Sequence, residues 1–180
     1  QKTGVDLPGE SCGIMFDYKN FHELEQATVA FGQGISVTPL QLVSAISACV
    51  NGGYLLQPHI LKEVRNNNNE IIYQAKRKVK RQVIKEETAK KVRDALESVV
   101  TDGGGRNAYI DGYRIGGKTG TAQKAVNGSY VGGGYILSFV GIAPIDDPQI
   151  VLYIAMVNPK NCIQYGGTTV APIARKMFLD

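Results

Sequence analysis

The residues with the clearest potential for chemistry form one short stretch, Gly112–Gln123, with the sequence GYRIGGKTGTAQ. Its first eight residues match G-x-x-x-x-G-K-[ST], the pattern of a loop whose backbone N–H groups cradle nucleotide phosphates. Its central residues, Lys118-Thr119-Gly120, also form the K-T-G triplet of enzymes that acylate a serine. The two interpretations require different neighbouring elements, so the flanking sequence can decide between them.

The flanking sequence disfavours a phosphate-binding loop. Such a loop needs a buried strand before it and a helix directly after it, because the helix N-terminus binds the phosphate. The preceding residues 106–111, RNAYID, lack the pattern of a buried strand, and residues 125–134 contain four glycines, which disfavour a helix. No apolar strand ends in an aspartate that could hold magnesium, since Ile150–Val157 runs into Asn158-Pro159.

Hydrophobic periodicity predicts helices packed on an antiparallel sheet, a fold of the α+β type within the broad α/β class. A K-T-G strand followed by two further strands would line a cleft. The expected helices are Asn20–Ala30, Thr38–Val50, Glu86–Val100 and Val170–Leu179. The expected strands are the triplet segment, Tyr135–Ala143 and Ile150–Val157, and a hairpin is expected from Tyr54–Val64 and Glu70–Ile84.

Local signals define several helix ends and faces. Asn20 is expected to cap the first helix, and Thr38 with Gln41 to form a capping box around Pro39 at the start of the second. The apolar faces expected to turn inward comprise Leu42, Ile46, Cys49 and Val50 in the second helix, Ala89, Val92, Leu96 and Val99 in the third, and Ile173, Met177 and Phe178 in the last.

Composition is that of an ordinary globular protein of 180 residues with a net charge of +4. The basic cluster Lys76–Arg81 lacks interleaved aromatic residues, which favours a solvated hairpin face over nucleic-acid binding. The chain has no run of 18 apolar residues that could span a membrane. Three widely spaced cysteines argue against a disulfide framework, and no C-x-x-C or H-x-x-x-H spacing indicates a metal site.

Beyond the triplet, several longer segments resemble class B penicillin-binding proteins, the serine transpeptidases that cross-link peptidoglycan. Gly117–Gln123, GKTGTAQ, looks like the third signature of that family. The other similar segments occur in the family's order and cover nearly the whole chain: Thr3–Glu10, Phe31–Gln41, Asn51–Tyr54, Ser138–Pro144 and Gly166–Pro172.

The resemblance implies a role for each residue of the triplet segment in a two-step acyl transfer on a D-Ala-D-Ala stem peptide. Lys118 would place positive charge beside the nucleophile and the substrate carboxylate, and Thr119 would donate a hydrogen bond to that carboxylate. Gly120 would let the substrate backbone approach the strand. The backbone N–H of Thr121 would be an oxyanion-hole donor, and Gln123 would border the site from the same face as Thr121.

The nucleophile of the family is missing from this chain. The family's serine lies in S-x-x-K and a second serine in S-x-N. None of the seven serines here is followed by lysine three positions later or by asparagine two positions later. Thr88–Lys91 matches T-x-x-K but lies in an expected surface helix. We therefore expect residues 1–180 to be the C-terminal part of a single transpeptidase domain, inactive alone, with the apolar face of its second helix uncovered.

Three hypotheses stay open from the sequence: part of a transpeptidase, a β-lactam sensor or β-lactamase, and a non-catalytic peptide-binding module. The resemblance implies no metal or organic cofactor. Its implied partners are peptidoglycan stem peptides, β-lactams and the upstream half of the same domain, but not nucleic acid. It also implies that the parent protein is held at the outer face of the cell membrane.

Overall fold

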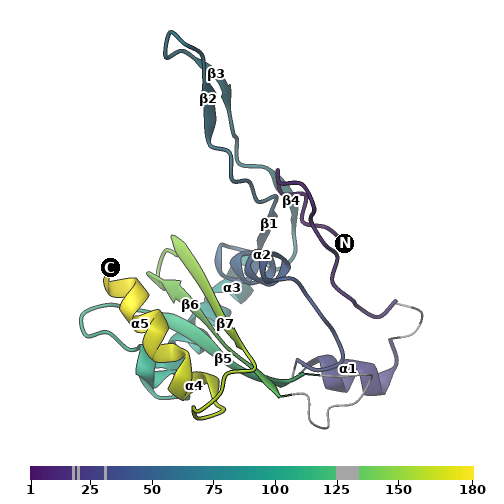
Figure 1. Ribbon diagram of the computed structural model, residues 1–180, viewed down its shortest axis with the longest axis vertical. Coiled ribbons are helices and arrows are strands. Elements are labelled where there is room, and N and C mark those ends of the chain that lie inside the picture. The colour runs from purple at the N-terminus through teal and green to yellow at the C-terminus, as the bar shows by residue number, and fades with distance from the viewer. Residues whose placement is uncertain (18, 20, 31, 125–133) are drawn as a thin grey trace. The chain divides into compact units, whose positions relative to one another are not determined.

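In the computed structural model, the described residues are 1–180 except 18, 20, 31 and 125–133. The chain forms two compact units, Gln1–Glu86 and Glu87–Asp180. Figure 1 shows helices and a long two-stranded ribbon in the first unit and a helix-covered sheet in the second. The predicted mixture of helices and antiparallel strands is confirmed.

The first unit contains helices α1 (Glu23–Ala30) and α2 (Pro39–Val50) and a ribbon of four short strands. The strands are β1 (Tyr54–Leu56), β2 (Glu63–Arg65), β3 (Ile71–Gln74) and β4 (Val79–Gln82). β1 pairs with β4 and β2 with β3, both antiparallel and each with one register shift. The predicted hairpin is therefore present, but each of its long extended segments is divided into two strands.

The predicted cap of α2 is confirmed. The Gln41 N–H donates to Thr38 Oγ1 at 3.2 Å, and the Thr38 N–H donates to Gln41 Oε1 at 2.8 Å. These reciprocal bonds satisfy two backbone donors that the first helical turn leaves without partners, and Pro39 has no N–H to satisfy.

Two expectations for the first unit are wrong in detail. α1 begins at Glu23, later than predicted, and Glu25 accepts from the His22 N–H at 3.1 Å; the proposed cap, Asn20, lies outside the described residues. Val50 was expected to be uncovered but is only 1% exposed, because the end of α2 turns directly into β1 and packs against it.

The N-terminal segment is tied to the ribbon by carboxylates. Asp6 accepts hydrogen bonds from the backbone N–H groups of Ile60 and Leu61, at 2.7 and 3.0 Å, and these bonds lower its pKa. Glu10 accepts from the hydroxyl and the N–H of Thr3, which lowers the pKa of Glu10 as well. The two acids thus close a compact loop and fix it to the chain beyond β1.

The second unit begins with α3 (Glu86–Thr101) and a short 3-10 helix, η2 (Arg106–Ala108). A three-stranded antiparallel sheet follows, in the order β5 (Gly116–Gln123), β6 (Tyr135–Ala143), β7 (Ile150–Val157). Helices α4 (Gly166–Thr169) and α5 (Ala171–Leu179) then pack against β6. The core cluster of buried residues comprises Val100, Ala108, Ile110, Ile115, Leu137, Phe139, Val170, Ala171 and Ala174.

α5 presents a different face from the predicted one. Ile173 and Met177 are exposed, whereas Ala171 and Ala174 are fully buried. Their small side chains let the helix lie close to the sheet. A Cβ added at Gly141 would come within 2.5 Å of the Phe178 ring, so the helix depends on a glycine across from it as well. The hydrophobic periodicity correctly predicted that Phe178 faces the sheet. The other residues on the buried face are alanines, because the helix lies too close to the sheet for larger side chains.

Among the described residues, the three cysteines are free, as the absence of a disulfide pattern indicated. Cys49 in α2 is half-buried, and burial raises the pKa of its thiol.

We expect the carboxylates of Asp6 and Glu10 to make the first unit sensitive to acid. Because their pKa values are lowered on folding, their contribution to stability is complete above about pH 5 and is lost as pH falls through the folded-state values. The free energy of unfolding, measured with urea between about pH 5 and pH 2, should fall less steeply in Asp6→Asn than in the parent sequence. Equal slopes would show that the Asp6 carboxylate contributes nothing to folding.

Candidate active-site strand

β5 carries all five predicted site residues along one free edge of the described sheet. It pairs with β6 on one side only, in a regular register from Gly116 opposite Ile142 to Gln123 opposite Tyr135. Figure 1 shows β5 at the border of the three-stranded sheet. A strand in this position has backbone groups available to an extended peptide.

The hydrogen-bond pattern determines which backbone groups face that edge. In an antiparallel ladder the N–H and C=O of one residue point the same way, and successive residues alternate. The Lys124 N–H donates to the Gly134 carbonyl at 2.9 Å, toward β6. The alternation therefore directs the N–H and C=O groups of Thr119, Thr121 and Gln123 toward the free edge.

Side chains alternate in the same way. Thr119 lies opposite Phe139 and Thr121 opposite Leu137, on the face that joins the helix-covered core. Lys118 lies opposite Val140, on the other face. The structure thus confirms that Gln123 shares the face of Thr121, and it places the side chains of Lys118 and Thr119 on opposite faces of one strand.

Lys118 is exposed and turns back over the strand edge. Its Nζ donates to the Thr119 carbonyl oxygen at 2.7 Å. This bond agrees with the direction of that carbonyl toward the free edge. The ammonium group therefore lies beside the edge where the outward N–H groups of β5 gather, although the side chain starts from the other face.

Thr121 connects the strand to α4. Its Oγ1 accepts a hydrogen bond from the Gly166 N–H at 3.2 Å. Gly166 is buried so tightly that an added Cβ would lie 2.5 Å from the carbonyl oxygens of both Gly120 and Ser138. The contact with α4 holds β5 at Thr121, the middle one of its three outward N–H groups.

Gly120 is a glycine for a reason that the sequence did not reveal. It lies opposite Ser138, and an added Cβ would overlap Ser138 Oγ. The resemblance implies that Gly120 lets a substrate backbone approach the strand; the structure adds that the Ser138 hydroxyl lies where a side chain at this position would start.

Sequence reasoning missed Tyr165, the residue before α4. Its hydroxyl and that of Thr119 both border Gly104, at 2.6 and 4.0 Å from the position of an added Cβ. Tyr165 is 44% exposed. In the sequence, the one feature that could have pointed to Tyr165 is its position directly before Gly166-Gly167. Its place beside β5 results from the fold.

An ion cluster anchors the start of the strand. Arg114 donates to both carboxylate oxygens of Glu97 in α3, at 2.7 and 2.6 Å, and also pairs with Asp146 in the turn between β6 and β7. The hydrogen bond from Arg114 lowers the pKa of Glu97. Arg114, four residues before Lys118, thus connects the segment before β5 to α3 and to the turn between β6 and β7.

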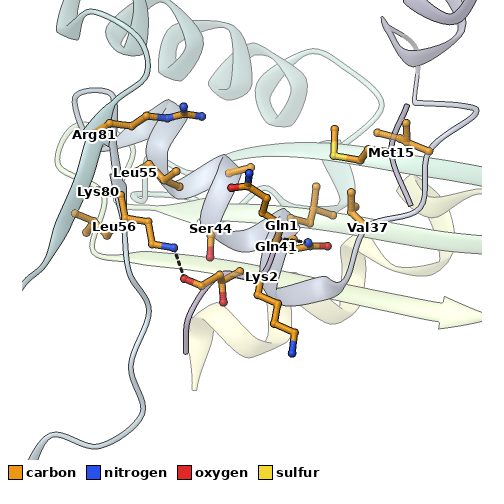
Figure 2. A pocket seen from close by; sticks show the side chains of 14 residues that line it. Gln1, Lys2, Met15, Val37, Gln41, Ser44, Leu55, Leu56, Lys80 and Arg81 are labelled. Atoms are coloured by element: carbon orange, nitrogen blue, oxygen red, sulfur yellow. Dashed lines mark hydrogen bonds between the residues drawn. The ribbon is translucent and has the colours of Figure 1, made fainter. Parts of the chain in front are cut away.

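The first unit has a separate apolar pocket of about 610 Å³, between its N-terminal segment, α2 and β1. Leu42, Leu55 and Leu56 line it, and Lys80 at its rim donates to the Thr3 carbonyl at 2.5 Å (Figure 2). Figure 2 shows several polar side chains around these apolar ones, including Lys2 and Arg81. This pocket, not Val50, is where α2 leaves apolar surface uncovered.

Comparison with known families gives the motif its context. The family of the penicillin binding protein transpeptidase domain matches residues 1–179. The chain belongs to this family. Its fold and its K-T-G strand are therefore those of a penicillin-binding protein transpeptidase domain, as the resemblance implied.

Curated relatives of this transpeptidase chain are much longer than the chain. Stage V sporulation protein D of Bacillus subtilis is 53% identical over 181 residues, which is 100% of this chain and 28% of the relative. The probable peptidoglycan D,D-transpeptidase PenA of Neisseria flavescens is 34% identical and matches 96% of this chain and 40% of its own length. The chain thus spans less than half of these relatives.

Solved structures show the same relationship. Penicillin-binding protein 3 of Mycobacterium tuberculosis superposes with a TM-score of 0.88 at 33% identity, covering 98% of this chain and 42% of that protein. The transpeptidase domain of Burkholderia pseudomallei penicillin-binding protein 3 superposes with a TM-score of 0.82 at 34% identity, covering 98% of this chain and 53% of that domain's chain. Structures of the Mycobacterium tuberculosis protein with aztreonam and with ampicillin are also similar to the chain.

Two further features of the described residues bear on function. Their His, Cys, Asp and Glu side chains form no group of three or more that could hold a metal ion. None of the helices in the described part of the chain is long and apolar enough to cross a membrane.

The overlap between Gly120 and Ser138 gives a prediction about the site strand. Gly120→Ala should destabilise the protein by about 1 kcal/mol, since the new methyl group must turn the Ser138 hydroxyl into another rotamer within a regular ladder. Adding Ser138→Ala should restore most of that loss, because the atom that overlaps is removed. Urea unfolding of both single variants and the double variant measures the coupling. Additive effects would contradict the packing described here.

Proposed function

We propose that this chain supplies the K-T-G strand of a peptidoglycan D,D-transpeptidase that works by serine acyl transfer. The observation that supports this most directly is that the family match extends over residues 1–179 while the K-T-G residues lie on the free edge of β5. The parent protein is an acyltransferase with the chain as part of its transpeptidase domain. The chain contributes binding and electrostatic groups and not the nucleophile.

The proposed reaction is a two-step acyl transfer in which the free edge of β5 would stabilise the developing negative charge. A serine oxygen attacks the carbonyl carbon between the two D-alanines, its proton passes to the departing amine, and an acyl ester and free D-Ala result. An amine of a second stem peptide then attacks the ester and releases the serine. Negative charge develops on the carbonyl oxygen in both steps, and the outward N–H of Thr121 would stabilise it.

The remaining residues hold the substrate. Lys118 brings its ammonium group to the edge, where it would attract the terminal carboxylate of the stem peptide and favour the deprotonated serine. Thr119 would donate its hydroxyl to that carboxylate. Gly120 keeps the ladder regular beside Ser138, so that an extended peptide can pair with the edge, and Gln123 would border the peptide further along β5.

The missing serine must come from an upstream half of the same domain. The described chain lacks S-x-x-K and S-x-N sequences and spans 28% of its sporulation relative. We propose that this half packs into the apolar pocket beside Leu42, Leu55 and Leu56, because 610 Å³ of apolar space is costly to leave hydrated. In this proposal residues 1–180 are one continuous part of a single transpeptidase domain.

Similar proteins support proposals about the cellular role, the ligands and the location of the parent protein. One relative is named for sporulation, so a role in spore cell-wall synthesis is favoured over elongation or division. The complexes with aztreonam and ampicillin support β-lactams as ligands of the parent. An anchor at the outer face of the cell membrane is part of the same proposal. The similarity to named transpeptidases disfavours a sensor, a β-lactamase or a non-catalytic module.

Intact-mass spectrometry with a β-lactam tests the proposal. The chain alone should gain no mass, and the chain together with a separately expressed upstream half should show one adduct, carried by the upstream half. An adduct on residues 1–180 would mean that a residue of this chain is the nucleophile. No adduct on the folded, full-length protein would reject the transpeptidase function.

Lys118→Ala in the full-length protein should slow β-lactam acylation by about 10²–10³-fold, because it removes the positive charge beside the reacting groups. Its melting temperature should stay close to that of the parent, since the side chain is exposed. Lys124→Ala, an exposed lysine just after β5, is the matched control and should acylate normally. The same loss in both variants would indicate a general effect of charge instead of a site role.

A further inference from the structure

The outer part of the ribbon in the first unit, Ile60–Gln82, has a composition unlike the rest of the chain. It holds seven lysines and arginines and two glutamates, a net charge of +5, while the whole chain carries +4. Glu63 is already paired with Arg65, at 2.8 Å. The ribbon is therefore the main concentration of positive charge, and the remainder of the chain is close to neutral.

Apolar side chains are exposed on both faces of the same ribbon. Successive residues of a strand point to opposite faces, so Ile71 and Tyr73 lie on one face and Ile72 on the other. They are 47%, 50% and 64% exposed, and Ile60 before β2 is 67% exposed. Every residue of β3 is exposed. Several exposed apolar side chains gathered on one short ribbon favour an interaction site.

The backbone edges of the ribbon are also open. β2 and β3 pair only with each other in the described structure, so each strand leaves one row of N–H and C=O groups without a strand partner. A two-stranded ribbon is marginally stable by itself in water. Its turn, by contrast, is well formed: Asn66 Oδ1 accepts from the N–H groups of Asn68 and Glu70, at 3.0 and 2.9 Å.

We propose that the ribbon Ile60–Gln82 is a docking site for an extended, acidic segment of another protein, which adds as a strand to a ribbon edge. Acidic side chains of that segment pair with the exposed Lys76 and Lys78, and apolar ones cover Ile72 or Tyr73. This inference is independent of the proposed catalytic function, since it uses no residue of β5.

The geometry favours a protein segment over an anionic membrane surface. A flat bilayer covers one face of a strand ribbon, whereas Ile72 and Tyr73 are exposed on opposite faces. Insertion by the tip is also disfavoured, because the turn consists of Asn66–Asn69 followed by Glu70. A segment that pairs with an edge can contact both faces with alternate side chains.

The test uses the full-length protein and a fluorescein-labelled peptide of alternating glutamate and valine, about ten residues long. Fluorescence anisotropy should show saturable binding that weakens as salt rises from about 0.05 M to about 0.5 M. The same peptide with lysine in place of glutamate should not bind. Backbone amides of β3 should exchange more slowly with the acidic peptide bound.

The double variant Lys76→Glu/Lys78→Glu should weaken binding by about tenfold or more, and Ile72→Thr by a smaller factor. Lys160→Glu/Lys176→Glu in the second unit is the control of matched charge change and should bind as the parent does. Melting temperatures of all variants confirm that they are folded.

Three outcomes would overturn the proposal. They are failure of the acidic peptide to bind, equal binding by the double variant and the parent, and binding to phosphatidylglycerol vesicles that the double variant loses while the peptide does not bind. None of these bears on β-lactam acylation, so the docking proposal and the catalytic proposal can fail separately.

Discussion

The candidate site depends on the antiparallel ladder between β5 and β6. The unbroken register from Gly116 to Gln123 determines both which side chains share a face and which backbone groups point outward. A shift of one residue would turn the outward N–H of Thr121 toward β6 and move Lys118 to the face of the core. The chemistry of the edge is therefore a property of the pairing and not of the triplet alone.

Close packing by glycine protects that register. Gly117, Gly120, Gly141 and Gly166 each lie where an added Cβ would meet a neighbouring side chain or carbonyl oxygen. Steric constraints of this kind leave a strand few alternative positions, since slipping would bring larger residues into these spaces. The bond from the Gly166 N–H to Thr121 then adds a specific link between α4 and the strand. Rigidity at the edge is what a preorganised oxyanion site requires.

Much of the fold could be predicted from local signals, and the failures have physical causes. The cap of α2 and the strands β6 and β7 follow from residue types that act over a few positions. The buried face of α5 could not be predicted in this way. Ala174 is buried and Ile173 is exposed because the helix lies close to the sheet, and local sequence does not determine that distance. In the candidate site, the position of Lys118 on a strand could be predicted from its motif and the strands that follow. The position of Tyr165 could not, since its approach to β5 is a long-range contact.

The hydrogen bond from Lys118 to the Thr119 carbonyl holds the ammonium group at the free edge of β5. An ammonium group at the free edge takes the nearest acceptor within reach, a carbonyl one residue away. A carboxylate of the substrate or a nucleophilic oxygen is a stronger, charge-assisted acceptor and would displace it. The bond to Thr119 costs little to break because it is solvent-exposed. The strand thus keeps its cation at the free edge, and in the proposed site binding would need rotation of this one side chain and no change in the ladder.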